Sequence, residues 1–336
     1  ARAEFLNYKN TGMSIIEMSH RSPEYAAMHA ETKALLRQLM EIPEDYEILF
    51  IQGGGSLQFL MTAANFFTNK RAAYANTGVW AKKAMAEAKR FGETYEACTS
   101  ADKNHSYIPQ ELTIKPDTAY LHITANNTIY GTQWQDFPDV SVPVICDMSS
   151  DILSRPVDVK KFSLIYAGAQ KNLGPAGVVI VIVKKAFLET ARTDLPPMLS
   201  YQNYADNDSL YNTPPVFAIY MVNKTLHWIK AQGGVKAIAA RNREKAQLIY
   251  DVIDASRGFY RGHAEKNSRS LMNITFNLPT QELEKDFIAE GKKRGFIGIG
   301  GHRLVGGCRV SAYNAVTPEA CRALANFMKE YQAKHE

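Results

Sequence analysis

The sequence predicts an α/β fold, with a large domain built on a mainly parallel sheet covered by helices and a smaller C-terminal α+β domain. Three observations support this prediction. Strand-like and helix-like segments alternate through the first two thirds of the chain, as in strands joined by helical crossovers. The later strand-like segments are apolar throughout, as expected for a parallel sheet buried on both faces. Near residues 231–235 the pattern changes to short strands and helices around a glycine-rich stretch.

The first elements follow from periodicity and from turn residues. A helix is expected over residues 24–41, where apolar side chains recur at three- and four-residue spacing and Pro43 ends the run. Ser56 is the expected N-cap of a second helix, and Gly92 is the expected C-cap of a third. In chain order, the first five elements are predicted as helix, strand, helix, strand and helix at 24–41, 46–51, 57–67, 71–75 and 80–91.

The rest of the chain adds strands to the large domain and then forms the small one. Four apolar strands are predicted at 119–124, 142–147, 164–167 and 178–183. Two helices follow, one running from Thr225 to the Gly233-Gly234 break and one at 235–255. The small domain is expected to contain a strand, a helix and a strand at 272–276, 281–294 and 308–313. We therefore predict a large domain over 1–231 and a small domain over 232–336. We also expect that a segment preceding Ala1 is missing.

Composition excludes several classes of protein. A chain of 336 residues suits about two domains, and 46% apolar with 22% charged residues is typical of a folded globular protein. The net charge of +5 is too small to indicate a nucleic-acid binder, and the basic residues are dispersed. The apolar run 178–183 is far shorter than the roughly 20 residues that span a bilayer. Neither a nucleic-acid nor a membrane partner is expected.

The four cysteines form no CxxC pair and show no metal-ligand spacing. They are Cys98, Cys146, Cys308 and Cys321. Free thiols of this kind are typical of a reducing compartment, so we expect a cytoplasmic protein without a metal site.

The chemistry centres on Asp147, which ends one apolar strand, and on Lys171, which follows another. Ligands of an open parallel sheet bind beyond the carboxyl ends of its strands, so both side chains should face one crevice. A partly desolvated lysine can form a Schiff base with an aldehyde, and a carboxylate can keep a pyridine ring protonated. This pair therefore suits pyridoxal 5'-phosphate. Taken alone, the two residues could equally be a solvated loop lysine and a helix cap.

Two further features fit such a cofactor. The stretch from Gly53 to Ser56 lies between a strand and a helix, where backbone N–H groups favour a phosphate. It matches neither a P-loop nor GxGxxG, which argues against a nicotinamide dinucleotide. Trp80, at a helix start, is either a core side chain or a platform stacked on an aromatic ring. Each feature alone is also compatible with a purely structural role.

The chain resembles the phosphoserine aminotransferase family, which belongs to the class-V pyridoxal-phosphate-dependent aminotransferases of fold type I. EMSHR, AGAQKN, NTPP and GHRLVGG are specific to this family. The matching stretches run in family order over nearly the whole chain: MSIIEMSHRSPEY (13–25), LFIQGGGSLQF (49–59), ANTGVWAKKAMAEAK (75–89), ITANNTIYGTQW (123–134), ICDMSSDILSRPVDVKKFSLIYAGAQKNLGPAGVVIVIV (145–183), LYNTPPVFAIY (210–220) and GHRLVGGCRVSAYNA (301–315).

The resemblance implies a role for each matching residue. Lys171 would form the Schiff base, Asp147 would contact the pyridine nitrogen, and Trp80 would stack on the ring. The other implied cofactor contacts are Gly55, Ser56, Gln170 and Thr128, with Asn212 and Thr213 completing the phosphate site of the neighbouring subunit. An active homodimer is therefore implied.

The resemblance also implies the reaction, which is reversible transamination of 3-phosphohydroxypyruvate with L-glutamate to O-phospho-L-serine and 2-oxoglutarate in serine biosynthesis. The related substrate 4-phosphohydroxy-L-threonine, of pyridoxine biosynthesis, stays open. Arginines bind such anions in bidentate fashion. Arg309 matches the arginine for the α-carboxylate. The distal phosphate or carboxylate is assigned to His20, Arg21, His302 and Arg303.

Some features depart from the family or leave alternatives. Members vary between arginine and serine at the position of Ser56, so one charge partner of the phosphate is absent here. The usual N-terminal Asn-Phe and Gly-Pro-Ala motif is not seen. A cysteine desulfurase would share Asp147 and Lys171 but needs a mobile nucleophilic cysteine, for which Cys308 is the nearest candidate. A nonenzymatic relative would be expected to lose Lys171 or Asp147, and both are present.

Overall fold

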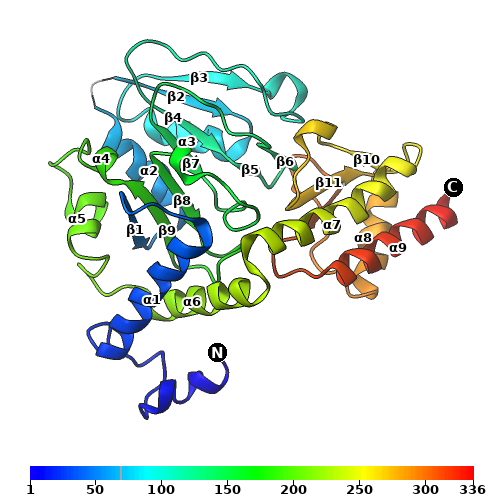
Figure 1. Ribbon diagram of the computed structural model, residues 1–336. Helices are drawn as coiled ribbons and strands as arrows, with labels where there is room; N and C mark the ends of the chain where they lie inside the picture. Colours follow the sequence, from blue (N-terminus) through cyan, green and yellow to red (C-terminus); the bar gives the residue numbers. More distant parts are fainter. Residues whose placement is uncertain (69) are drawn as a thin grey trace.

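The computed structural model describes residues 1–68 and 70–336. Within these residues, seven strands form one sheet in the order β1-β9-β8-β7-β4-β2-β3 (Figure 1). The five strands from β8 to β3 are mutually parallel, whereas β9 is antiparallel to both β8 and β1. The strands are β1 (Tyr46–Ile51), β2 (Arg71–Asn76), β3 (Thr94–Thr99), β4 (Thr118–Thr124), β7 (Val144–Asp147), β8 (Leu164–Gly168) and β9 (Val179–Lys184).

This arrangement confirms a mainly parallel α/β sheet but corrects the interpretation of the run at 178–183. Its continuous apolar sequence reflects burial on both faces, because every residue from Val179 to Val183 is fully buried. Burial on two faces does not fix strand direction, and β9 returns antiparallel between β1 and β8.

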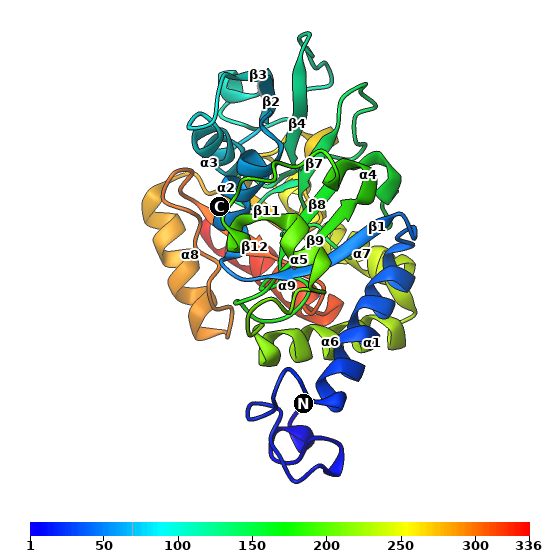
Figure 2. The same cartoon turned by 90° about the vertical axis from the view of Figure 1, so that its left-hand side faces the viewer.

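Helices cover both faces of the sheet (Figures 1 and 2). One face packs against α1 (Pro23–Met40) and α6 (Val216–Ala231), and the other packs against α2 (Gly54–Phe66), α3 (Val79–Ala88), α4 (Lys185–Leu188) and α5 (Tyr201–Asp206). Strand β1 shows the division, because Ile48 and Phe50 join the first core while Leu49 and Ile51 join the second. Alternate side chains of one strand thus enter two separate hydrophobic layers.

A long helix, α7 (Gly234–Ala255), leads from the large sheet to a second, antiparallel sheet (Figure 1). In the described chain that sheet has three strands, β10 (Arg261–Gly262), β11 (Asn273–Asn277) and β12 (Cys308–Ser311). With α7, α8 (Gln281–Lys293) and α9 (Pro318–His335), it encloses a third hydrophobic core. A short hairpin, β5 (Asn126–Asn127) with β6 (Thr132–Gln133), lies beside it. The division of the chain at residue 231 stays a prediction.

Two predicted helix caps are wrong. Helix α2 begins at Gly54 with Gly53 as its N-cap, so Ser56 lies inside the first turn. Gly53 adopts φ +90°, a conformation that glycine tolerates best, and this starts the helix earlier than a serine cap would. Helix α3 ends at Ala88, before Gly92. Gly92 is instead needed for packing, because a Cβ there would lie 2.3 Å from the Phe67 ring.

No helix in the described part of the chain is both long enough and apolar enough to cross a lipid bilayer.

Candidate active site

The two residues singled out from the sequence meet at the carboxyl edge of the large sheet. Asp147 is the last residue of β7, and Lys171 lies in the turn that follows the neighbouring parallel strand β8. Both line a cavity of about 140 Å³. The cavity wall comprises Gly55, Ser56, Phe59, Trp80, Thr124, Asn126, Asp147, Ser149, Ser150, Gln170 and Lys171.

Lys171 is half-buried, and its surroundings weaken its charge. Burial lowers the pKa of Lys171 below the usual lysine value. The negative charge of Asp147 opposes this effect, and the positive charge of Arg309 adds to it. A lowered pKa raises the fraction of neutral amine, which is the form that attacks a carbonyl or accepts a proton.

Asp147 is a buried residue of the same cavity wall. One carboxylate oxygen, Oδ1, accepts a hydrogen bond of 2.9 Å from the Ser149 backbone N–H. Burial raises the pKa of Asp147, while the charge of Lys171 and the hydrogen bonds from Ser149 oppose that rise. A positively charged group placed against this carboxylate would favour its ionised form.

Trp80 forms a third wall and connects the two sheets through Thr128. Its indole Nε1 donates to Thr128 Oγ1 at 3.1 Å, and Lys171 Nζ lies 6.0 Å from the centre of its ring. The Thr128 carbonyl in turn accepts a hydrogen bond of 3.3 Å from Nη1 of Arg309, on β12. Arg309 Nε is buried and has no hydrogen-bond partner among the described residues. The small-domain arginine is therefore held beside the cavity with donor capacity left over.

The N-terminus of α2 forms the remaining side of the cavity. Gly53 carries no side-chain cap, and the following N–H groups of the first turn face outward without intrahelical partners. Gly55 is close to Ser149, since a Cβ at Gly55 would lie 3.7 Å from Ser149 Oγ. Ser56 and Gln170 are exposed at the rim. Together these groups can bind an anion.

Basic side chains lie near Arg309 on the small-domain side. His302 and Arg303 lie in the segment between α8 and β12. The pKa of His302 is lowered by its partial burial and by the positive charges of Arg309, Arg303 and Lys83. Several cations thus converge where an anionic substrate could neutralise them.

Eight predicted residues do not line the cavity of their own chain, namely His20, Arg21, Thr128, Asn212, Thr213, His302, Arg303 and Arg309. His20 and Arg21 precede α1, whose N-cap is Ser22. Asn212 and Thr213 lie beside the end of β1, where the amide of Gln52 donates to the Thr213 carbonyl at 3.0 Å. In Figure 2 the N-terminal segment projects away from the sheets.

Sequence reasoning missed several polar residues of the cavity wall. Thr124 ends β4, the strand beside β7, and its buried hydroxyl has no hydrogen-bond partner among the described residues. Ser149 follows Asp147 and donates its N–H to it. Asn126 and Ser150 are joined by a hydrogen bond of 2.9 Å. Their position after strand ends was the available signal, but small polar residues after strands are common in loops.

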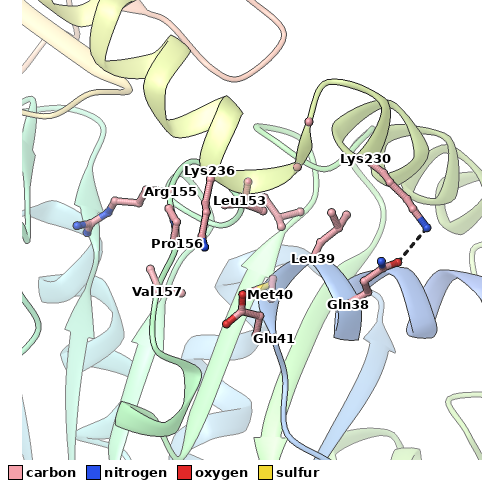
Figure 3. Close-up of a pocket in the computed structure, with 13 residues that line it drawn as sticks. Gln38, Leu39, Met40, Glu41, Leu153, Arg155, Pro156, Val157, Lys230 and Lys236 are labelled. Atoms are coloured by element: carbon pink, nitrogen blue, oxygen red, sulfur yellow. Dashed lines mark hydrogen bonds between the residues drawn. The ribbon is translucent and has the colours of Figure 1, made fainter.

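A second cavity, of about 390 Å³, lies between the end of α1, the segment 153–157 and the α6–α7 junction (Figure 3). The hydrogen bond drawn in Figure 3 runs from Lys230 Nζ to Gln38 Oε1 and is 3.0 Å long. None of the site residues predicted from the sequence lines this cavity. We therefore assign the chemistry to the cavity that holds Asp147 and Lys171.

Comparison with known proteins identifies the family. The Aminotransferase class-V family profile matches residues 1–324. The phosphoserine aminotransferase of Bacillus subtilis (strain 168) is 55% identical over 338 residues, covering 100% of this chain and 94% of that protein.

Solved structures agree. The phosphoserine aminotransferase from Bacillus circulans subsp. alkalophilus superposes with a TM-score of 0.98 at 52% identity, covering 100% of this chain and 94% of the other. A phosphoserine aminotransferase from Trichomonas vaginalis, described as bound to pyridoxal phosphate, gives 0.93 at 38% identity over 98% of this chain and 94% of the other. The chain therefore belongs to the phosphoserine aminotransferase family of class-V aminotransferases.

Proposed function

We propose that this protein is a phosphoserine aminotransferase that uses pyridoxal 5'-phosphate. The reaction is the reversible transfer of an amino group from L-glutamate to 3-phosphohydroxypyruvate, giving 2-oxoglutarate and O-phospho-L-serine for L-serine biosynthesis. One observation carries the proposal: a buried carboxylate and a lysine of lowered pKa share a cavity that also has an indole wall and a helix N-terminus. The names of the relatives supply the substrate.

The residues present fit the cofactor at each of its functional groups. The Asp147 carboxylate suits the pyridine nitrogen, the Lys171 amine suits the aldehyde, and the Trp80 face suits the ring. The N-terminus of α2, with Gly55, Ser56 and Gln170, suits the phosphate, and Thr128 suits the ring hydroxyl side. The Thr124 hydroxyl, which has no hydrogen-bond partner in the described part of the chain, adds hydrogen-bonding capacity to this wall. When bound, the cofactor supplies an electron sink for the negative charge that develops at the substrate α-carbon.

Lys171 is proposed as the group that moves the proton. As a neutral amine it accepts the proton from the α-carbon of glutamate, and as an ammonium it returns a proton later in the same turnover. Burial favours the neutral form, and nearby Asp147 stabilises the charged one. This balance suits a group that must act as both base and acid. Asp147 holds a proton at the ring nitrogen by keeping its own negative charge beside it.

The substrate is proposed to bind through its negative charges. Arg309 receives the α-carboxylate, because its Nη1 donates to the Thr128 carbonyl while its Nε has no partner among residues 1–68 and 70–336. His302 and Arg303 receive the distal phosphate or carboxylate. Each product retains two anionic groups, so the same cations serve both half-reactions.

We further infer a homodimer with shared active sites. Asn212 and Thr213 lie outside their own cavity, and we propose that they complete the phosphate site of the partner subunit. We propose the same for His20 and Arg21 with the distal substrate group. Apolar side chains exposed around these segments would be covered in such a dimer, namely Phe5, Leu6, Met13, Ile16, Tyr211 and Phe217. Leu6 alone is 82% exposed.

The cysteine-desulfurase alternative is disfavoured by the thiol it would need. Cys308 is buried, and burial followed by the charge of Glu284 raises its pKa to about 12. A thiolate at this position is therefore scarce at neutral pH. All four cysteines of the chain are free, which supports the inference of a reducing compartment such as the cytoplasm.

The test is a steady-state assay with glutamate and 3-phosphohydroxypyruvate. Lys171→Ala should lower kcat by about 10³-fold or more, because both proton transfers lose their carrier. Lys329→Ala, which removes an exposed lysine on α9, is the matched control and should retain full activity. Normal turnover by Lys171→Ala would refute the assignment. The same assay with 4-phosphohydroxy-L-threonine as amino donor decides the second substrate.

A further inference from the structure

The residue after the lysine, Asn172, joins three segments of the fold. It lies in the turn after β8, and only 4% of its surface is exposed. Its Nδ2 donates to the carbonyl of Ile152 at 3.2 Å, and its Oδ1 accepts from the backbone N–H of Asn314 at 3.0 Å. Ile152 belongs to the turn that follows Asp147, and Asn314 follows β12 of the second sheet. One buried amide therefore bridges the lysine turn, the aspartate turn and the small-domain strand.

Asn314 extends this bridge with its own side chain. Its Nδ2 donates to the Leu153 carbonyl at 3.0 Å, and its Oδ1 accepts from Asn242 of α7 at 2.9 Å. Asn242 also donates to the Ser154 carbonyl at 2.8 Å. Asn314 and Asn242 are 2% and 0% exposed. Because buried amides are costly when left unpaired, these contacts should form or break together.

The bridge ends at groups proposed to act in the reaction. Lys171 precedes Asn172 directly, and Arg309 lies five positions before Asn314 on β12. The lysine turn is closed locally by hydrogen bonds from Leu173 and Gly174 to the Ala169 carbonyl. Those bonds fix the shape of the turn but not its position relative to the aspartate turn or the small domain. Asn172 makes both of these longer-range connections.

We propose that Asn172 is a positioning residue, which holds Lys171 in register with Asp147 and with the small-domain strand that carries Arg309. Asn172 does not face the cavity and takes no part in proton transfer. It acts through the backbone that it shares with Lys171. The proposal rests on the proposed function only in assuming that the placement of Lys171 matters for turnover.

Three variants separate positioning from stability. Asn172→Ala removes the hydrogen bonds to both Ile152 and Asn314. Asn314→Ala keeps the backbone N–H that donates to Asn172 Oδ1, so this variant should disturb Lys171 less. Asn223→Ala is the matched control, because Asn223 is also a buried asparagine whose amide makes two hydrogen bonds, to Glu31 and Thr32, but it lies in α6. Asn172→Ser serves as a milder replacement if Asn172→Ala does not fold.

The first readout uses cofactor-free protein. The pH dependence of labelling of Lys171 by 1-fluoro-2,4-dinitrobenzene, followed by peptide mass spectrometry, reports its pKa and accessibility. We expect Asn172→Ala or Asn172→Ser to move the pKa of Lys171 upward toward the ordinary lysine value and to raise its labelling rate severalfold, since the side chain becomes more solvated. Two charged groups act on Lys171, namely Asp147 and Arg309, and both are unchanged in these variants. Asn223→Ala should reproduce the wild-type profile.

The second readout is kinetic and is made on the cofactor-loaded enzyme. We expect kcat for Asn172→Ala to fall by about 10²-fold with a much smaller change in KM, because a misplaced group costs rate more than binding. The kcat of Asn314→Ala should lie between those of Asn172→Ala and the wild type. A Lys171 labelling profile that is unchanged in Asn172→Ala and Asn172→Ser, or that moves equally in Asn223→Ala, would overturn the proposal. If the wild type lacks phosphoserine transamination yet the labelling profile moves, the proposed function fails and the positioning role stands.

Discussion

At the scale of single residues, the site depends on two side chains whose burial drives them in the same direction, toward neutrality. Burial lowers the pKa of Lys171 and raises that of Asp147, while each one's charge stabilises the other's. A cofactor with a protonated ring nitrogen would change this balance, because its positive charge would stabilise the Asp147 carboxylate and disfavour the charged form of Lys171. Paired groups with environment-dependent protonation are typical of acid–base sites.

Asp147 and Lys171 could be found from the sequence because one ends a strand and the other follows the neighbouring strand of the same sheet. Trp80 could be named but not placed, because an indole at a helix start is as often in a core. Ser149 and Thr124 were missed, since their importance comes from a neighbouring strand and not from local sequence.

The indole of Trp80 gives a prediction at this scale. Trp80→Ala should weaken binding of pyridoxal phosphate about tenfold, because aromatic stacking contributes about 0.5–1.5 kcal/mol beyond the loss of buried area. Trp80→Phe keeps a ring but loses the hydrogen bond to Thr128, so its loss should be smaller. Fluorescence titration of cofactor-free protein measures both dissociation constants. Equal affinity of wild type and Trp80→Ala would show that the ring does not bind there.

At the scale of elements, apolar content located most strands and the longer helices. It did not reveal β3, an edge strand whose Glu96 and Thr99 are exposed and interrupt the apolar run. Helix α6 begins at Val216, nine residues before the predicted Thr225. Its first two turns are apolar on every side, including the exposed Phe217, so they lack the polar face that marks a helix. The direction of β9 depends on the whole topology and not on its sequence.

Helix α2 provides a prediction at this scale, because its N-cap Gly53 has φ +90° and a Cβ there would lie 2.4 Å from the Leu57 side chain. Gly53→Ala should lower the free energy of unfolding by about 1–3 kcal/mol through strain and crowding, and it should weaken cofactor binding. Gly12→Ala is the matched control, since Gly12 has φ +78° and no atom of the described residues would lie within 4 Å of a Cβ added there. Urea unfolding of the two variants separates crowding from backbone strain. A Gly53→Ala protein as stable as Gly12→Ala would contradict this account.

At the scale of the whole molecule, the chain places the cofactor residues on the large sheet and brings Arg309 from the small one. The hydrogen bond from Arg309 to the Thr128 carbonyl and the asparagine bridge from Asn172 to Asn314 both cross between these sheets. Such a site is assembled by tertiary packing. Sequence motifs could therefore name its residues, but they could not show that these two connections join the sheets. The proposed dimer would add residues of a partner subunit to this site.

Subunit complementation tests whether Asn212 serves the active site of the neighbouring subunit. Lys171→Ala and Asn212→Ala homodimers should each be impaired, the first severely. If Asn212 serves the neighbouring subunit, a mixed dimer has one doubly altered site and one intact site. Refolding an equal mixture should then restore about a quarter of wild-type activity, because half of the dimers are mixed and each has one working site. Activity of the mixture no greater than the average of the two homodimers would place Asn212 in its own subunit's site or outside any site.

We conclude that this chain transaminates a phosphorylated amino acid at the cavity formed by Asp147 and Lys171. The most direct measurement is the half-reaction of the cofactor-loaded protein with O-phospho-L-serine, followed by the visible absorbance of the cofactor and by mass spectrometry of the keto-acid product. We predict rapid conversion to 3-phosphohydroxypyruvate, with kcat/KM for L-serine lower by about 10²-fold or more, because the converging cations are left without the distal phosphate. Equal reaction with L-serine, or reaction with L-cysteine alone, would contradict the account.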